Sequence, residues 1–246
     1  MKNGNLKKVI KFIGTSYIWT IPALILFDFI TKVIAFNSFD GIECATKVII
    51  PDFFSFTLYG NTGMAWSLLN NATWLLAVIS VAASGALIFY LVKKYKDMTT
   101  IYRACIYLII AGCMGNMIDR ICYYIPGTMY HDFGVIDFLS FKLFKTSHYA
   151  GYDFPVFNVA DSLLCVGVFC LVIYVAVTEI LFHIYKGSAM DAIVKLQTKY
   201  SNTKDAEIKK VLSSLAESLK SDYYKPIKEN LKKAESYLKE DVPNNE

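Results

Sequence analysis

The chain has 246 residues, of which 55% are hydrophobic and 19% charged, with a formal net charge of +4 and a mean hydropathy of +0.39. This hydropathy, concentrated in long apolar runs, excludes an ordinary soluble enzyme. The six cysteines lie mostly within these runs and form no CxxC motif, and the three histidines have no ligand spacing, so neither a disulfide framework nor a metal site is expected.

Four apolar runs are about as long as a bilayer-spanning helix, which needs about 20 residues. In chain order they are residues 16–36, 72–92, 101–121 and 159–184. The sequence therefore predicts an all-α membrane protein with four transmembrane helices. The first run also fits a cleaved signal peptide, but it contains Asp28 and Lys32 and no small-residue cleavage site follows it.

The basic residues predict the orientation, because Lys and Arg near span ends remain cytoplasmic. They concentrate at the N-terminus, between the second and third runs and after the fourth, whereas residues 37–71 and 122–158 contain only Lys47, Lys142 and Lys145. Both termini are therefore expected in the cytoplasm, with 37–71 and 122–158 as outer loops.

The first outer loop has a β-like stretch at 53–59, FFSFTLY, followed by the turn signal Gly-Asn-Thr-Gly at 60–63. We expect a small β-structured region on the outer membrane surface. The second outer loop, rich in Tyr, Phe and Gly, is expected to cap a site on this surface and to contain a short interfacial helix.

Residues 186–246 differ from the rest in their high, mixed charge. Their apolar residues recur at helical spacing: Ile208, Val211, Leu212, Leu215, Leu219, Ile227, Leu231 and Leu238. We expect a membrane domain over 1–185 and a cytoplasmic tail of amphipathic helices over 186–246. A solvated, partly disordered tail is the alternative.

Several charged residues lie within the runs, where they are costly and normally face other helices. Asp28 and Lys32 are four residues apart on one helix face, and Asn116, Asp119 and Arg120 share a face in the third run. The first pair either neutralises itself for insertion or binds substrate. The second group either fastens the helices structurally or orders a site.

Two further carboxylates lie on the outer side. Asp137 is in the second outer loop and Asp161 is at the start of the fourth run. Asp161 also suits a helix cap, and Asp137 a surface loop. If the two meet, they share one proton, so that one carboxylate accepts a proton from water while the other donates to a peptide carbonyl.

Five motifs in order carry a resemblance to the lipoprotein signal peptidase (signal peptidase II) family of aspartyl proteases: DFITK, NTGMAWSLL, GCMGNMIDRI, GVIDF and FPVFNVADS. The resemblance covers nearly all of residues 16–184. It implies that Asp137 and Asp161 are the catalytic pair. It assigns the other site residues to Asp28, Lys32, Asn61, Gly63, Asn116, Arg120, Asn158 and Ala160.

The resemblance also implies removal of signal peptides from prolipoproteins, just before a diacylglyceryl cysteine, at the outer face of the bacterial inner membrane. No cofactor or nucleic acid is implied. The implied partners are such substrates, membrane lipids and globomycin-type inhibitors, and we expect a monomer. Met64 and Trp66 depart from the usual pattern, and 142–153 is longer than usual.

Three rival interpretations remain at this level. A small transporter or proton channel would also contain buried charges, but it would distribute them through the membrane. Another type of intramembrane aspartyl protease would carry GxGD, which GVID only partly matches. An inert membrane anchor for the tail would leave the aspartates without a purpose.

Overall fold

The computed structural model describes residues 14, 16–63, 73–131, 133–142, 154–200, 206–221 and 223–239. The chain divides into two compact units, Met1–Leu171 and Val172–Glu246. The long helix that begins at Val159 contributes to both units. The predicted division at 185 therefore stays a prediction.

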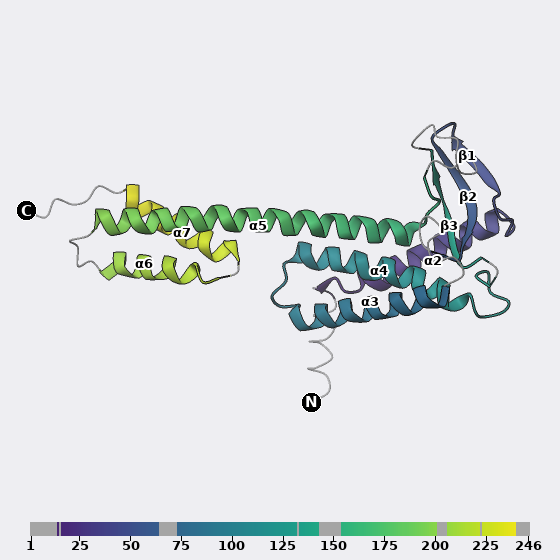
Figure 1. Ribbon diagram of the computed structural model, residues 1–246, viewed down its shortest axis with the longest axis horizontal. Helices are drawn as coiled ribbons and strands as arrows, with labels where there is room; N and C mark the ends of the chain where they lie inside the picture. The colour runs from purple at the N-terminus through teal and green to yellow at the C-terminus, as the bar shows by residue number, and fades with distance from the viewer. Residues whose placement is uncertain are drawn as a thin grey trace, which may run out of the picture. The chain divides into compact units, whose positions relative to one another are not determined.

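Within the described residues, four helices are long and apolar enough to cross a membrane: α2 (Thr20–Ser38), α3 (Thr73–Lys94), α4 (Thr100–Cys122) and α5 (Val159–Lys199) (Figure 1). This confirms the predicted fold class. Pro22 is tolerated in the first turn of α2, where its missing N–H has no intrahelical partner. The hydroxyl of Thr99 caps α4 by accepting from the N–H of Tyr102.

Helix α4 is the central helix of the first unit. Half of the residues in the most hydrophobic stretch of α4 are buried within the protein, whereas only 6% are buried in that stretch of α5. The apolar side chains of α5 are therefore left to face lipid. Glycines allow the close packing of these two helices. A Cβ on Gly112 would lie 2.5 Å from the carbonyl oxygen of Ala160, and one on Gly167 would lie 2.8 Å from a side-chain carbon of Ile109.

We predict that Gly112→Ala destabilises the first unit by about 1–3 kcal/mol, because the added methyl group meets α5 backbone that cannot move aside. The matched control is Gly85→Ala in α3, where nothing lies within 4 Å of the new Cβ. Thermal unfolding in detergent should show a lower Tm for the first variant alone. Equal melting temperatures for both variants and the wild type would contradict the packing.

A three-stranded antiparallel sheet, ordered β1-β2-β3, joins the two loops that the sequence predicts to lie on the outer side. Its strands are β1 (Thr46–Ile50), β2 (Phe54–Asn61) and β3 (Val135–Phe141). The first two strands lie in the loop expected to hold β structure. The sequence does not predict strand β3, because its residues are expected in an outer loop with a short interfacial helix.

The sheet is fastened to the helices by apolar packing. Leu58, Tyr130 and Ile136 form a buried cluster. Phe36, at the C-terminal end of α2, and Phe39, just after this helix, pack against the cluster. In Figure 1 the sheet stands at one end of the helices α2, α3 and α4. This placement positions β3 over the end of the helices where the charged residues gather.

The second unit contains the remainder of α5 with α6 (Ala206–Ser218) and α7 (Tyr224–Lys239). Its core consists of small and aliphatic side chains: Ala189, Ala192, Leu196, Leu215, Ile227, Leu231 and Ala234. Pro226 lies in the first turn of α7, where its missing N–H has no intrahelical partner. Two helices are thus present where the apolar spacing of the tail predicts them.

Candidate active site

The site begins at the first turn of α5. The side chain of Asn158 accepts a hydrogen bond from the N–H of Asp161 (3.0 Å), and the carboxylate of Asp161 accepts from the N–H of Asn158 (3.1 Å). This reciprocal pair is a capping box, which satisfies free donors at the helix start. Asn158 is therefore the N-cap of α5, Asp161 is its partner in the first turn, and the second oxygen of Asp161 remains available to another group.

Strand β3 brings Asp137 to the same place. Two residues after Asp137, Leu139 forms a bridge with Phe157, whose N–H donates to the carbonyl oxygen of Leu139 at 3.0 Å. Phe157 directly precedes Asn158, so the start of α5 is held in register with β3. Segments about 20 residues apart in sequence are thereby joined at the site.

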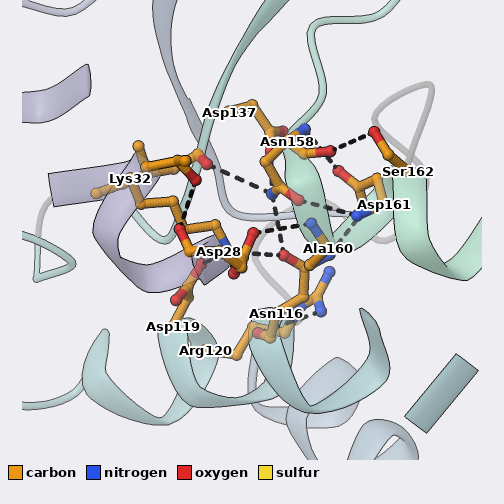
Figure 2. A network of polar contacts seen from close by, with 12 residues as sticks. Asp28, Lys32, Asn116, Asp119, Arg120, Asp137, Asn158, Ala160, Asp161 and Ser162 are labelled. Atoms are coloured by element: carbon orange, nitrogen blue, oxygen red, sulfur yellow. Dashed lines mark hydrogen bonds and ion pairs between the residues drawn. The ribbon is translucent and has the colours of Figure 1, made fainter. Parts of the chain in front are cut away.

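Asn158 connects the two acids. Its side-chain N–H₂ donates to Asp137 Oδ1 at 2.7 Å and to Asn116 Oδ1 at 3.0 Å. The N–H₂ of Asn116 in turn donates to Asp161 Oδ1 at 2.7 Å. Figure 2 shows these side chains converging from α4, β3 and α5. Asp137 and Asp161 thus belong to one hydrogen-bond network of two asparagines.

Beneath this network lies a buried ion cluster. The ammonium group of Lys32 is 2.7 Å from Asp28 and 2.6 Å from Asp119, and it donates to Asn116 Oδ1 at 3.1 Å. The side chain of Lys32 is fully buried, so its three N–H donors all require partners. Asn116 therefore connects this cluster to the aspartate network.

Asp28 has a second partner outside its own helix. Its Oδ1 accepts from the backbone N–H of Ala160 at 2.8 Å, which supplies the start of α5 with a further cap. A Cβ on Gly115 would lie 2.8 Å from Asp28 and 2.9 Å from Ala160, so only glycine leaves room for this contact. Asp28 thus positions the helix that carries Asp161.

Asn61, at the end of β2, approaches Asp137 from the other side. Its side-chain N–H₂ donates to Asp137 Oδ2 at 2.9 Å, and its side-chain Oδ1 accepts from the backbone N–H of Gly63 at 3.0 Å. Arg120, on α4, donates to the carbonyl oxygen of Asn116 at 3.4 Å. All eleven residues singled out in the sequence therefore lie in or beside one network.

The charge balance of the site is negative. Four carboxylates, those of Asp28, Asp119, Asp137 and Asp161, face two cations, Lys32 and Arg120. Asp137 is 1% exposed. Burial, together with the charge of Asp161, raises the pKa of Asp137 well above its ordinary value. The arrangement thus favours a proton on this carboxyl group.

Two supporting residues escaped the sequence analysis. The buried hydroxyl of Tyr130 lies near Asp119, and burial together with that charge raises the pKa of Tyr130. Phe157 makes the bridge to β3. Tyr130 lies outside the five motifs, and Phe157 lies within FPVFNVADS but has no polar group that would indicate a role there. Met64, Trp66 and most of 142–153 lie outside the described residues.

Within the described ranges, no group of three or more His, Cys, Asp or Glu residues is arranged to hold a metal ion.

A protein-family model described as Signal peptidase (SPase) II matches residues 20–177, which is more than half of the chain. The chain belongs to the signal peptidase II family. It is a peptidase of a bacterial membrane, and the matched segment contains every residue of the network.

Relatives and solved structures agree with this membership. The lipoprotein signal peptidase of Listeria monocytogenes serotype 4a is 34% identical over 158 residues, which cover 64% of this chain and 90% of that protein. The lipoprotein signal peptidase of Staphylococcus aureus strain JH9 is 33% identical, and the match covers 66% of this chain and 88% of that enzyme. A bacterial membrane enzyme whose structure was solved by the in meso method at 1.9 Å is 31% identical, with a TM-score of 0.51. The match covers 67% of this chain and 94% of that enzyme.

Proposed function

We propose that this signal peptidase II family member is an aspartic endopeptidase that removes the signal peptide from diacylglyceryl-modified prolipoproteins, just before the lipidated cysteine. The observation that carries the proposal is the connection of Asp137 and Asp161 through Asn158 and Asn116. Two carboxyl groups in one buried network, next to an excess of negative charge, share a proton more readily than they ionise together.

The two acids have different surroundings, and this difference supports a different role for each. Asp161 lies in the first turn of α5, where the helix dipole favours a negative charge. Asp137 is almost fully buried, which favours its neutral form. Asp161 is thus the base that takes a proton from water, and Asp137 is the acid that donates to the carbonyl oxygen of the scissile bond.

The reaction then proceeds as general acid–base hydrolysis. The water oxygen attacks the scissile carbonyl carbon, and a tetrahedral diol forms. The proton held by Asp161 passes to the leaving nitrogen as the C–N bond breaks, and Asp137 recovers its proton from the diol. The asparagines and the Lys32 cluster hold the two carboxylates in place and do not react themselves.

The position of the site suits a lipidated substrate. The basic residues Lys93 and Lys94 end α3 at what we propose is the cytoplasmic side, and the aspartates lie at the opposite end of the spans. The scissile bond of a membrane-anchored signal peptide lies at that outer surface. The acyl chains of the substrate remain in lipid while its peptide enters the site.

The experiment that tests the function compares two substrates with the purified full chain in detergent. One is a prolipoprotein whose cysteine carries diacylglycerol, and the other is the same protein without the lipid. Mass spectrometry should show a new N-terminus at the lipidated cysteine and little cleavage of the unmodified protein. Failure to cut the lipidated protein, by folded enzyme, would reject the proposal.

The rival interpretation as a transporter or proton channel fits less well. Asp28, Asp119, Asp137 and Asp161 gather at one end of the helices. Glu179 lies further along α5, is 67% exposed and pairs with His183. Among the described residues, these groups do not continue the network across the bilayer.

The pH dependence of cleavage should report the proton on Asp137. The N–H₂ of Asn61 stabilises the ionised form of Asp137, so Asn61→Ala raises the pKa of this carboxyl group further. Cleavage requires protonated Asp137 and falls as pH rises through its pKa. We therefore expect the alkaline limb of the rate profile to move to higher pH.

The control for this experiment is Thr46→Val, which removes a hydrogen bond to Thr57 elsewhere in the same sheet. Its alkaline limb should coincide with that of the wild type. An unchanged alkaline limb, with the acid limb moved to higher pH instead, would mean that Asp137 acts in its ionised form.

A further inference from the structure

The second unit lies largely beyond the family match, which ends at residue 177. Its three helices run alternately up and down. Tyr224 at the start of α7 stacks on Tyr185 of α5, with ring centroids 5.8 Å apart, whereas Lys199 near the end of α5 donates to the carbonyl oxygen of Tyr237. Helix α7 is therefore parallel to α5, and the turn before α7 lies beside Tyr185.

Helix geometry gives the distance of Tyr185 from the start of α5 along the helix axis. Tyr185 lies about 26 residues after Val159, which is about 39 Å at 1.5 Å per residue. The hydrocarbon core of a bilayer is about 30 Å thick, and the bilayer with its headgroups is about 40–45 Å thick. If α5 enters the membrane at Val159, Tyr185 lies in the opposite headgroup layer.

Aromatic and basic residues gather at this level. The ammonium group of Lys228 lies 5.4 Å from the ring centre of Tyr185, and that of Lys186 lies 5.3 Å from the ring centre of Phe182. Lys225 and Tyr223 are exposed at the start of α7, where Tyr223 is 62% exposed. Aromatic rings with lysines are typical of a membrane interface.

Lysines outnumber the acidic residues near the cluster, which are Glu229 beside Lys228 and, in the sequence just before Tyr223, Asp222. Glu179 is one turn from His183 and pairs with it, and Glu229 is the single carboxylate in the first two turns of α7. The interfacial cluster, defined as Tyr185, Lys186, Tyr223, Lys225 and Lys228, thus carries three lysines. Three lysines at this depth match the phosphate groups of anionic lipids.

We propose that the interfacial cluster is a binding surface for the headgroups of anionic phospholipids. The tail then lies against the inner membrane surface through the start of α7, and the tyrosine rings occupy the boundary between headgroups and acyl chains. This surface belongs to the second unit and is separate from the aspartate network.

The test uses the full chain in neutral detergent, titrated with phosphatidylglycerol or phosphatidylcholine, with retained lipid counted by native mass spectrometry. The variant Lys186→Gln/Lys225→Gln/Lys228→Gln removes the charge of the cluster. Each lysine near an anionic surface contributes about fivefold, so the affinity for phosphatidylglycerol should fall about a hundredfold. At 1 M salt the preference of the wild type should vanish, because the Debye length falls to about 3 Å.

The matched control is Lys209→Gln/Lys210→Gln/Lys239→Gln. It removes the same charge from exposed lysines at the opposite end of α6 and α7, where Tyr237 contacts Glu207. Its lipid affinity should remain within about twofold of the wild type, and both triple variants should unfold at the wild-type temperature. Equal losses in the two triple variants would overturn the proposal, as would a wild type that binds both lipids equally.

Discussion

We expect Asp137→Asn and Asp161→Asn each to lower the rate of prolipoprotein cleavage by about 10³-fold or more. Asparagine keeps the size of the side chain but can neither accept a proton from water nor donate one as a carboxylic acid. General acid–base catalysis contributes about 10²–10⁴-fold, and each variant also disturbs the partner carboxyl group through their shared network.

The measurement is the initial rate of signal-peptide release by purified protein. Asn at position 161 still offers an oxygen to the N–H of Asn158, so the capping box and the fold should remain. The matched control is Asp52→Asn, which changes an almost fully exposed carboxylate on the same side of the protein. A folded Asp161→Asn variant that cuts at the wild-type rate would exclude Asp161 as the base.

The second large effect concerns stability. Lys32→Met should lower the free energy of unfolding by about 3–5 kcal/mol, because it leaves Asp28 and Asp119 buried without their cation. Adding Asp119→Asn to this variant removes one of the two unpaired charges. We therefore expect the double variant to recover part of the lost stability.

Unfolding of the full chain in mixed detergent micelles, followed by circular dichroism, measures these differences. The matched control is Lys142→Met, since Lys142 pairs with Asp52 at 3.9 Å and both side chains are exposed. An exposed pair is worth at most about 1 kcal/mol, so this variant should unfold close to the wild type. Equal effects at positions 32 and 142 would show that the buried cluster does not stabilise the fold.

Much of the architecture was predictable because its signals are local. Hydropathy over about 20 residues identifies a membrane helix without knowledge of its neighbours, and the four predicted runs overlap α2, α3, α4 and α5. The β-rich pattern at 53–59 likewise matches β2. Helix α5 extends beyond the predicted run, because its continuation is amphipathic and packs against α6 and α7.

Strand β3 shows the limit of local signals. Asp137 was assigned to a loop, but it pairs with Tyr59 of β2 in the sheet, and the strand is covered on both faces. Edge pairing of this kind depends on a partner that is distant in sequence. The bridge between Leu139 and Phe157, which aligns β3 with α5, depends on tertiary structure in the same way.

The sequence by itself determined which side chains are charged within apolar runs, and the residues of the candidate site all came from this observation and the five motifs. Tertiary structure decided their partners. Asp28 and Lys32 form a pair, as their spacing suggests, but Asp28 also caps α5 at Ala160, and Lys32 also binds Asp119 and Asn116. A buried charge requires several partners at once, and only the packing of α2, α4 and α5 brings them within reach.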